Sequence, residues 1–584
     1  MADSSVRRDQ LRWSLSVFAL ALALRGLALW QLSGSVLLDT IIGDARNYEL
    51  WARRLAGGDW LGSEVFYQAP LYPYFLGVVY SLFGEEVLWA RCLQIVIGAA
   101  SCALLAQAGW RFLSKPVGIA AGLLLACYAP AIVADVAVGK SVLDIFFVCL
   151  SLWILSGMHD GPRPGPCLGL GLSLGLLILT RENALAFLVV LVPWLALRAS
   201  TSRQRIGVTA LFAVGIALVL LPVALRNWHV GGAFHLTTSQ FGHNFFIGNN
   251  EAADGTYAPV VQRKGEPQIE RQDAIDLAER AMGRSLTPAE VSGYFTRAGL
   301  RYIRSQPLDW LALMGRKVVL AFNAVELVDT KDQYSYHDLS SVLWLTGGWL
   351  HFGLLVPLAL LGVWVTWSDR ARLLPVYLLF LVYTSTLLVF YMFGRYRIPL
   401  IPMLALFASA AVVRLPEFLR ENRAGRIAAG FVAASAAAVF CNWPVSDEDY
   451  MRSVTQYNLG NELVAAGRID EAMERYAAAI RLHEGNAVAH HNLGALLAGR
   501  EDLDAARLQY ERALEILPDY TQARLNLALT HVDLGLAQEA RGEFAQAIES
   551  FERALRYDPG LEEARENLRR VREQPARRGP SGGA

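Results

Sequence analysis

Long apolar runs follow one another from the start of the chain to about Cys441, and polar positions gather in the stretches between them. A helical run of about 20 apolar residues crosses roughly 30 Å of hydrocarbon. The pattern therefore predicts an all-α, polytopic membrane bundle over residues 1–441 with about 11 spans. We place these spans near residues 12–32, 87–109, 116–134, 141–157, 166–181, 183–197, 206–225, 340–366, 373–392, 398–414 and 426–441.

Two longer polar connections, 33–86 and 226–339, interrupt the series of apolar runs. The first connection contains a short apolar run with two prolines, residues 70–84. This run is too short to span a bilayer, and its prolines remove backbone donors. It therefore predicts a partial or interfacial segment.

A different periodicity begins after Asn442, where alanine-rich, charged sequence replaces the apolar runs. The stretches YNLGNELVAAGRIDEAMERYAAAIRLHEGN (457–486) and HNLGALLAGREDLDAARLQYERALEILPDY (491–520) carry the same Leu-Gly, Ala and Tyr positions 34 residues apart. This period and these residues resemble tetratricopeptide repeats, in which small residues let paired helices approach closely. A third copy carries about seven extra residues, which we place in a lengthened first helix. We predict a tetratricopeptide α-solenoid over 450–573 and a disordered tail over 574–584.

Composition agrees with a membrane protein that has a polar tail. Hydrophobic residues make up 54% and charged residues 18% of the chain, and the mean hydropathy is +0.32; soluble proteins usually carry about a quarter charged residues. The formal net charge is zero, so we expect no nucleic acid among the partners. The six cysteines lie in or beside apolar runs without CxxC spacing and are interpreted as packing residues. The sequence has no HExxH motif and none of the glycine-rich signatures of soluble nucleotide-sugar enzymes.

The distribution of Lys and Arg predicts the orientation in the membrane. Basic residues precede the odd-numbered spans, for example at 7–12, 111–115 and 198–205, whereas the alternate connections include both long loops. Because short basic loops stay on the cytoplasmic side, we expect the long loops and the repeat domain to be extracytoplasmic. This predicts a multi-pass protein of the inner (cytoplasmic) membrane; an endoplasmic-reticulum protein with a lumenal tail has the same pattern.

Polar motifs recur at the expected extracytoplasmic edge of the bundle. In chain order they are IIGDARNYELW (41–51), YQAPLYPYF (67–75), LTREN (179–183), FGHNFFIGNN (241–250) and GRYRIPLIPML (394–404). This ordered set on a multispan chain resembles the glycosyltransferase family 39-like group of the GT-C class, which includes protein O-mannosyltransferases and lipid A aminoarabinose transferases. The resemblance covers residues 10–440 and implies inverting transfer of a sugar from a polyprenyl-phosphate donor to a protein, lipid or glycan acceptor at the extracytoplasmic face. Aminoarabinose transferases have a lysine where this chain has Ala69, so the sugar of that subgroup is not implied.

The resemblance implies that Asp44 is the catalytic acidic residue of the first loop. A carboxylate there can take the proton of an incoming hydroxyl or amine as it attacks the anomeric carbon. The alternative is a helix N-cap, because Asp44 precedes an amphipathic helical pattern. The family often has a second acidic residue that positions the acceptor or a metal, and Asp135 stands near that place. An ion pair with Lys140 is the alternative for Asp135, and a divalent metal cofactor is left open.

Four arginines are candidates for binding the donor phosphate: Arg25, Arg46, Arg395 and Arg397. Guanidinium groups bind phosphate oxygens bidentately and stay charged at a membrane interface. For the two arginines of the GRYR motif, the alternative is snorkelling towards lipid headgroups. Arg25 lies inside the first predicted span, where a charge needs a partner. An ion pair between Arg25 and an acidic residue such as Asp135 is therefore the alternative there.

The remaining loop candidates for binding sugar or acceptor are Tyr67, Gln68, Asn249 and Glu326. For the loop asparagines, turn formation is the alternative. Arg181 and Glu182, which interrupt an apolar stretch, are interpreted as a mutual or local ion pair. Tetratricopeptide arrays form grooves for partners, so we expect the tail to hold the acceptor or an assembly partner. A non-catalytic membrane scaffold acting through the repeats, or a glycan ligase, are the alternative functions.

Overall fold

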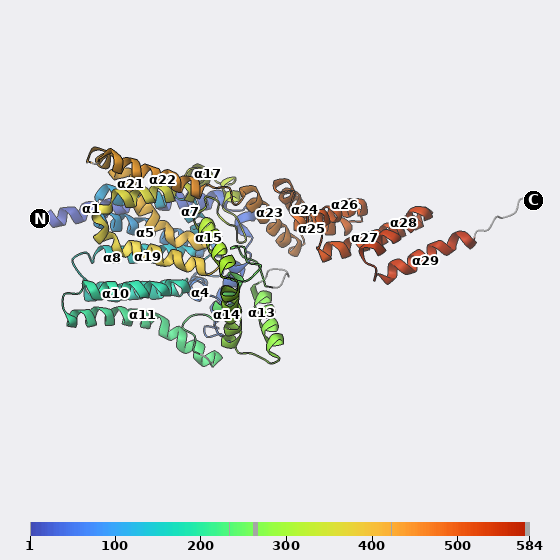
Figure 1. Ribbon diagram of the computed structural model, residues 1–584, viewed down its shortest axis with the longest axis horizontal. Helices are drawn as coiled ribbons and strands as arrows, with labels where there is room; N and C mark the ends of the chain where they lie inside the picture. Colours follow the sequence, from blue (N-terminus) through green and yellow to red (C-terminus); the bar gives the residue numbers. More distant parts are fainter. Residues whose placement is uncertain (1, 233, 261–266, 422, 578–584) are drawn as a thin grey trace, which may run out of the picture. The chain divides into compact units, whose positions relative to one another are not determined.

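The computed structural model describes residues 2–232, 234–260, 267–421 and 423–577, and the regular structure in these ranges is helical, without strands (Figure 1). The all-α prediction is therefore confirmed. The chain divides into two compact units. The membrane unit comprises Met1–Asp329 and Gln333–Ser446, and the repeat unit comprises Thr330–Asp332 and Asp447–Ala584.

Six helical stretches of the described residues are long and apolar enough to cross a membrane. They are Arg8–Leu32 in α1 (Ala2–Leu32), Val87–Phe112 (α5), Ser202–Gly231 (α11), Trp367–Val389 with α19 (Arg370–Val389), Gly394–Glu421 with α21 (Ile401–Glu421), and Ala424–Cys441 (α22). Two bent pairs raise the number to 8 if each is one span: α6 with α7 (Lys115–Ala126 and Ala129–Val136) and α17 with α18 (Ser341–Gly347 and Phe352–Val365). The chain is thus a multi-pass membrane protein, but the count of about 11 spans is not confirmed.

Shorter apolar helices complete the bundle: α4 (Leu71–Phe83), α8 (Ser141–Ser156), α9 (Pro164–Ile178) and α10 (Phe187–Arg198), with short 3-10 turns at Glu182–Ala186, Trp367–Asp369 and Ile398–Leu400. Small residues let these helices pack closely. A Cβ on Gly171 of α9 would clash with the backbone of α11, and a Cβ on Gly215 of α11 would clash with the backbone of α9. Because helices in lipid associate largely through such close contact, these glycines fix how α9 and α11 pack.

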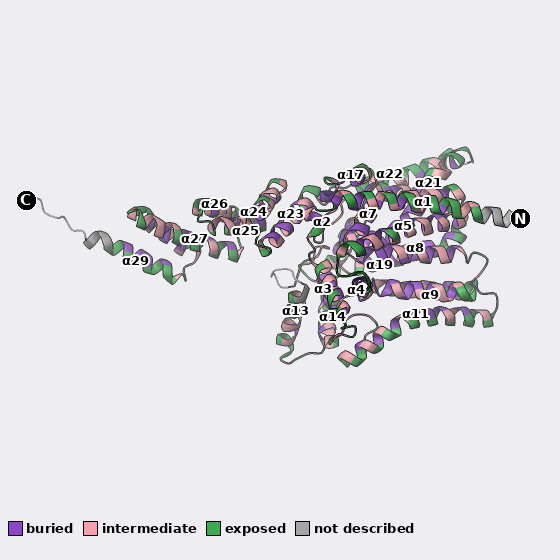
Figure 2. Ribbon diagram, turned by 180° about the vertical axis from the view of Figure 1, so that it is seen from behind, coloured by how far each residue is buried: buried purple, intermediate pink, exposed green. Residues whose placement is uncertain are grey.

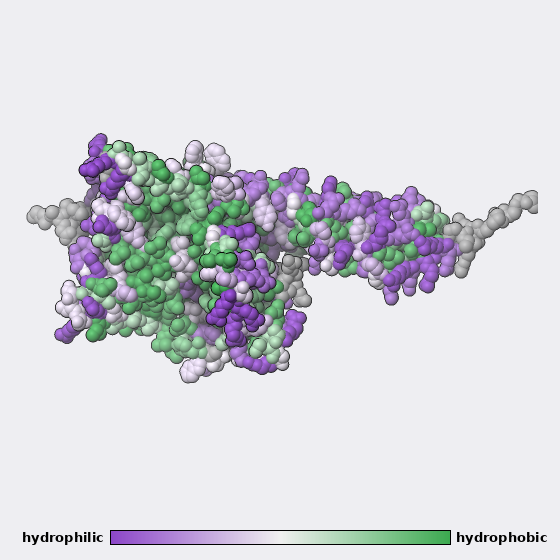
Figure 3. Space-filling model, in the orientation of Figure 1, coloured by the Kyte–Doolittle hydropathy of each residue, from purple (hydrophilic) through white to green (hydrophobic). Residues whose placement is uncertain are grey.

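The surface of the membrane unit has the hydropathy expected in a bilayer. On the face shown in Figure 3, hydrophobic side chains cover the middle of the helices and hydrophilic ones lie towards both helix ends. Large apolar side chains of the membrane unit are exposed, including Leu218 of α11 and Val432 of α22. Figure 2 shows the burial of the same helices, with α8 largely buried and α22 largely exposed.

The two long connections fold into short helices. The first connection contains α2 (Val36–Asp39), α3 (Asp44–Ala56) and α4, and the second contains α12 (Phe241–Ile247), α13 (Pro267–Met282), α14 (Pro288–Ser305), α15 (Pro307–Phe322) and α16 (Tyr334–His337). The short α20 (Gly394–Arg397) leads into α21. The start of α3, the loop after α15 and the turn of α20 supply the charged residues of the candidate site.

The repeat unit is built from antiparallel helix pairs. Its helices are α23 (Glu448–Ala465), α24 (Ile469–Leu482), α25 (Ala487–Ala498), α26 (Leu503–Ile516), α27 (Thr521–Ala540), α28 (Phe544–Tyr557) and α29 (Glu562–Arg577). Gly460 faces the ring of Tyr476, and Gly494 faces Tyr510 in the same way one repeat later. The extra residues of the third copy lie in α27, which has 20 residues against 12 in α25. Of the predicted disordered tail, residues 578–584 lie outside the described residues.

Candidate active site

Asp44 is the first residue of α3, and the preceding Gly43 is the N-cap. Gly43 has φ 62° and ψ −135°, a conformation that favours glycine. No side-chain hydrogen bond caps this helix, so the N-cap alternative for Asp44 is wrong. Instead, the Oδ1 atom of the Asp44 carboxylate accepts a hydrogen bond of 2.5 Å from Gln68 Nε2. The structure thus brings together two predicted site residues, Asp44 and Gln68.

Arg395 joins Asp44 to a second carboxylate. One terminal nitrogen of its guanidinium lies 2.6 Å from Asp44 Oδ2, and the other lies 2.9 Å from Asp329 Oδ2. The three side chains are between 20% and 25% exposed, so a ligand can reach the cluster. Asp329 was missed at the sequence level, since it sits in the loop after α15 without a motif around it. Only the fold places it beside residues of α3 and α20.

The pKa values of the two carboxyl groups in the cluster are shifted in opposite directions. Burial by itself would raise the pKa of Asp44, but Arg395, Lys140 and the hydrogen bond from Gln68 outweigh it, so the pKa lies below its ordinary value. Burial raises the pKa of Asp329 to about 6; Arg395 opposes this shift and the charge of Asp44 adds to it. At neutral pH both groups are ionised, and Arg395 is shared between them.

A second arginine fixes the turn that carries Arg395. Arg181 donates to the backbone oxygen of Arg395 at 2.9 Å, and its Nε lies 2.6 Å from Asp144 Oδ2. Arg181 and Asp144 are 6% and 0% exposed, and the guanidinium lies over the ring of Tyr396. Arg181 does not pair with Glu182, whose carboxylate accepts hydrogen bonds from two polar side chains of the second connection. Of the mutual or local ion pair expected for Arg181 and Glu182, the mutual pair is therefore wrong, and Arg181 forms its ion pair with Asp144.

Lys140 adds a cation to this site. It precedes α8 as its N-cap residue, and burial lowers its pKa to about 8, with the charges of Arg181 and Arg395 adding to that effect. The positive charge of Lys140 also lowers the pKa of Asp44. Within the ranges that the structure describes, no hydrogen bond or ion pair engages the Lys140 ammonium group. The alternative sequence interpretation, an ion pair between Asp135 and Lys140, is therefore wrong.

Asp135 instead pairs with Arg25 in the interior of the bundle. Arg25 Nε lies 2.5 Å from Asp135 Oδ2, and both side chains are 1% exposed. Arg25 also donates to the oxygen of Ala126 at 3.2 Å, the carbonyl that Pro130 cannot bind because proline has no N–H. Arg25 thus stabilises the bend between α6 and α7. The ion pair is the one that the alternative interpretation of Arg25 predicted. Neither group is open to a substrate in this arrangement.

Arg397 has different partners from Arg395, although only one residue lies between them in the chain. It is 2% exposed, pairs with Glu326 at 2.6 Å and donates to the oxygen of Asn323 at 2.6 Å. Its guanidinium also lies over the ring of Phe352. The buried Arg397 neither snorkels to headgroups nor faces an open site, and Glu326 is its ion-pair partner.

Asn249 is held inside the membrane unit. It is 1% exposed; its Nδ2 donates to the oxygen of Val389 at 2.7 Å and its Oδ1 accepts from Trp310 at 3.0 Å. Lys317 acts beside it, donating to the oxygen of Leu388 at 3.1 Å. Both side chains satisfy carbonyls at the C-terminal end of α19. Asn249 therefore holds the segment that leads to α20.

Two predicted residues lie nearer the surface. Tyr67 is half-buried, and its hydroxyl lies 3.4 Å from His243 Nδ1. Arg46 is exposed on the first turn of α3. The described residues contain no group of three or more His, Cys, Asp or Glu side chains placed to hold a metal ion.

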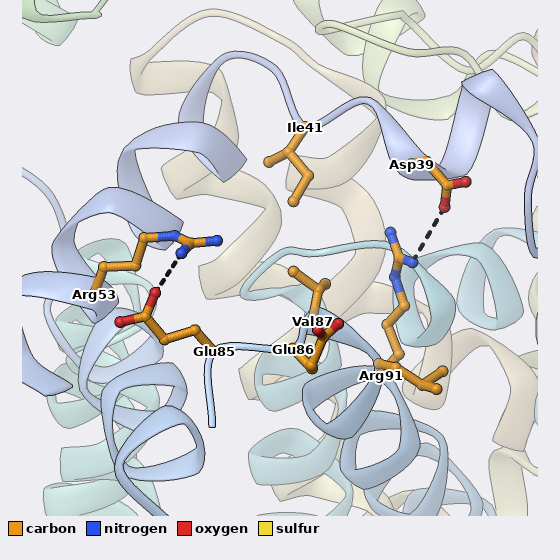
Figure 4. A pocket seen from close by; sticks show the side chains of 8 residues that line it. Asp39, Ile41, Arg53, Glu85, Glu86, Val87 and Arg91 are labelled. Atoms are coloured by element: carbon orange, nitrogen blue, oxygen red, sulfur yellow. Dashed lines mark hydrogen bonds and ion pairs between the residues drawn. The ribbon is translucent and has the colours of Figure 1, made fainter. Parts of the chain in front are cut away.

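A cavity of about 450 Å³ opens elsewhere on the first connection (Figure 4). It is lined by Asp39, Ile41, Arg53, Glu85, Glu86, Val87, Leu88 and Arg91. Figure 4 shows its charges paired across the opening, Arg53 with Glu85 and Arg91 with Asp39. Its lining includes neither Asp44 nor Arg395, so it is distinct from the charged cluster.

Comparison with known families agrees with the two-part chain. Residues 67–227 match the family described as dolichyl-phosphate-mannose-protein mannosyltransferase. Residues 460–500 and 528–561 match tetratricopeptide repeat families. No curated protein matches the chain.

Two solved structures with similarity are those of an oligosaccharyltransferase and of ArnT. The Archaeoglobus fulgidus oligosaccharyltransferase tethered with an acceptor peptide has 13% identity and a TM-score of 0.42, with 79% of this chain and 58% of that chain covered. ArnT from Cupriavidus metallidurans bound to undecaprenyl phosphate has 15% identity and a TM-score of 0.37, with 83% and 80% covered. The chain thus spans less than two thirds of the oligosaccharyltransferase. The family matches confirm the predicted resemblance: residues 67–227 of the membrane unit match the dolichyl-phosphate-mannose-protein mannosyltransferase family, and two stretches of the tail match tetratricopeptide repeats.

Proposed function

We propose that this protein is an inverting glycosyltransferase that moves a sugar from a polyprenyl-phosphate donor to an acceptor at the extracytoplasmic face, with Asp44 as the base. The observation that carries the proposal is the cluster of Asp44, Arg395 and Asp329, with Lys140 beside it. It combines a carboxylate, cations for a phosphate and partial exposure. The family match over 67–227 supports the donor class, since the family's description names a dolichyl-phosphate sugar.

The donor phosphate binds between Arg395 and Lys140. Lys140 has a charge with no bonded partner in the described structure, whereas Arg25 and Arg397 are committed to buried carboxylates. A phosphodiester carries one negative charge, and the leaving polyprenyl phosphate carries more. At an effective dielectric constant of about 20, each cation about 4 Å from that charge contributes about 4 kcal/mol before solvent screening. Stabilisation that grows as the bond to phosphate breaks lowers the barrier.

Donor binding also frees the base. While Asp44 is paired with Arg395, its lowered pKa makes it a weak proton acceptor. A phosphate on Arg395 offsets the guanidinium charge and raises the pKa of Asp44. The carboxylate then takes the proton of the acceptor hydroxyl or amine, that atom forms the new bond to the anomeric carbon, and the bond from this carbon to the phosphate oxygen breaks. Gln68 keeps the carboxylate oriented throughout.

Acceptor binding involves the exposed surroundings of Asp44. Tyr67 lies in the same connection as Asp44 and contacts the acceptor, and the tetratricopeptide groove holds a protein acceptor or an assembly partner. We place the site and the repeats on the extracytoplasmic side of the inner membrane, in keeping with the basic loops on the opposite side.

The test is donor turnover by purified protein. Full-length protein in lipid vesicles receives a polyprenyl-phosphate donor with a labelled sugar, and release or transfer is measured together with the anomeric configuration of the product. We expect turnover with inversion, and a donor KM at least 10-fold higher in Lys140→Met. A wild-type protein that turns over no donor from a panel of sugars refutes the proposal and favours the scaffold alternative. A donor requirement for long diphosphate-linked glycans favours the ligase.

A further inference from the structure

The cavity of the first connection lies where two membrane spans reach the edge of the bilayer. α1 ends at Leu32 and α2 begins at Val36, while α5 begins at Val87, which lines the cavity. α1 and α5 pack against each other, and α4, the longest apolar helix between them, has 13 residues and is too short to span. The end of α1 and the start of α5 are therefore on the same side of the membrane, and the cavity lies at the level of the lipid headgroups.

The lining of this cavity holds three carboxylates and two guanidinium groups, so one negative charge is in excess. Arg53 pairs with Glu85, and Arg91 lies 3.6 Å from Asp39 (Figure 4). Glu86 is the remaining carboxylate. It is the N-cap residue of α5, but its side chain makes no capping hydrogen bond, and within the described residues no ion pair engages it. Glu86 is thus available to a positively charged group of a ligand.

Arg91 is the buried cation of the cavity. It is 8% exposed, and one of its terminal nitrogens donates to the oxygen of Leu38 at 2.6 Å. The distance of 3.6 Å to Asp39 is longer than a hydrogen bond, and the buried Nε has no hydrogen-bond partner among the described residues. A guanidinium carries five N–H donors, so most of those of Arg91 are unused. A charge at the membrane edge with unused donors suits phosphate oxygens, which accept such bonds strongly.

Apolar side chains border these charges. Leu88 lines the cavity itself, and its sequence neighbours Leu82, Phe83 and Trp89 are exposed. The rings of Phe83 and Trp89 lie 5.8 Å apart. Exposed apolar residues at the end of a span face acyl chains, and aromatic residues gather at the level of the headgroups. A ligand in this cavity therefore meets charges of both signs next to an apolar surface.

We infer that the cavity binds the headgroup of a zwitterionic phospholipid with a primary ammonium group, the chemistry of phosphatidylethanolamine. The phosphate binds Arg91, and the ammonium group binds Glu86 and Glu85. The acyl chains lie along Leu88 and Trp89. The volume of about 450 Å³ is within the range of small-molecule sites. This site is distinct from the cluster around Arg395, and the inference goes beyond the proposed transfer reaction.

The charges of the cavity also indicate which lipids are disfavoured. An anionic phospholipid such as phosphatidylglycerol brings a phosphate without a cation, so the excess carboxylate repels it. Phosphatidylcholine has a cation, but its quaternary ammonium has no N–H to donate to a carboxylate. A primary ammonium group has three N–H donors, as the side chain of lysine has. Preference for phosphatidylethanolamine over both is therefore the signature of the site.

Lipid binding by purified, delipidated full-length protein tests the inference. The protein in detergent is titrated with phosphatidylethanolamine, phosphatidylcholine and phosphatidylglycerol that have identical acyl chains, and bound lipid is measured by native mass spectrometry. We expect a single phosphatidylethanolamine to bind with a Kd about 10-fold lower than that of either other lipid, because it alone forms charge-assisted hydrogen bonds at both ends of its headgroup.

Two variants separate the two ends of the headgroup. Glu86→Gln should weaken phosphatidylethanolamine about 3–10-fold without weakening the other two lipids, because only the ammonium group loses a partner. Arg91→Gln should weaken all three about 10-fold, because the phosphate is common to them. Glu64→Gln is the matched control: Glu64 is an exposed carboxylate of the same connection, pairs with Arg271 at 2.6 Å and does not line the cavity. It should leave all three affinities unchanged.

Three results would overturn the inference. Equal binding of the three lipids would show that only general contact with lipid is measured, and tighter binding of phosphatidylglycerol would make the cavity an anion site. An unchanged affinity of Glu86→Gln for phosphatidylethanolamine would remove the ammonium site; this variant decides the matter even if the buried Arg91 is needed for folding. Displacement of the lipid by an equal concentration of free phosphoethanolamine would overturn the assignment to a lipid, since the acyl chains would then contribute nothing.

Discussion

Replacing Asp44 by asparagine removes one charge from the cluster and keeps its size. The structure makes this substitution informative because Asp44 is not an N-cap, so no capping bond is lost. Asparagine can still accept a hydrogen bond from Arg395 or Gln68 through its one amide oxygen. What disappears is the capacity to take a proton and the charge that faces the guanidinium at 2.6 Å.

The magnitude follows from these contacts. A hydrogen bond to a charged group contributes about 1.5–3 kcal/mol, and Arg395 keeps its second partner, Asp329, at 2.9 Å. We therefore expect a loss of stability of only about 1–2 kcal/mol, reduced further by the partial exposure of the pair. Loss of a general base typically slows the chemical step by about 10²–10⁴-fold. This corresponds to about 2.7–5.4 kcal/mol of barrier, more than the effect on folding.

The assay compares donor binding with turnover in lipid vesicles. Asp44→Asn should bind a polyprenyl-phosphate sugar at least as tightly as the wild type, because Arg395 is freed from a competing carboxylate, yet transfer the sugar at least 100-fold more slowly. Glu49→Gln is the matched control. Glu49 lies on the same helix and pairs with the exposed Arg53 at 2.8 Å, so its loss should leave turnover unchanged. Thermal unfolding of both variants shows that each is folded.

Wild-type turnover by Asp44→Asn would refute the reasoning, because a group other than Asp44 would then be taking the proton. Loss of donor binding with a normal rate at saturation would also refute it, since that pattern assigns Asp44 to binding. A slow Glu49→Gln would show that general disruption of α3, rather than chemistry, lowers the rate.

Three further predictions concern charge, packing and orientation. The kcat/KM for the donor should fall as the pH rises through about 8, where Lys140 loses its proton; Lys140→Arg should remove this step and keep donor binding, and a step that persists in Lys140→Arg contradicts the assignment. Lys317→Met should lower the free energy of unfolding by about 1–3 kcal/mol, because buried carbonyls lose their donor, and an unchanged melting temperature would contradict this. A phosphatase fused after Ser446 should be active and one fused near Arg203 inactive; the reverse pattern would place Asp44 in the cytoplasm.

Local sequence determined much of the architecture. Apolar runs determine which segments enter the membrane, because the hydrocarbon requirement acts on each segment by itself. The repeat array could also be predicted from the sequence, because Gly460 contacts Tyr476 within one repeat and the pattern returns every 34 residues. Asp44 could be singled out because its motif is short and lies directly after an apolar run. For the spans the hydropathy of the segment itself decides, and for the repeats the deciding contacts are close in sequence.

The partners of the charged residues were decided only by tertiary structure. Arg395 and Arg397 share one short motif, yet the first bridges Asp44 and Asp329 and the second is buried against Glu326. The sequence left two partners open for Asp135, Arg25 and Lys140; the fold pairs it with Arg25 on another helix and leaves Lys140 without a partner in the described structure. A charge in or near a membrane takes whichever opposite charge the helix packing brings within reach, because leaving it unpaired is costly. That packing joins segments tens to hundreds of residues apart, and local patterns along the chain do not determine it.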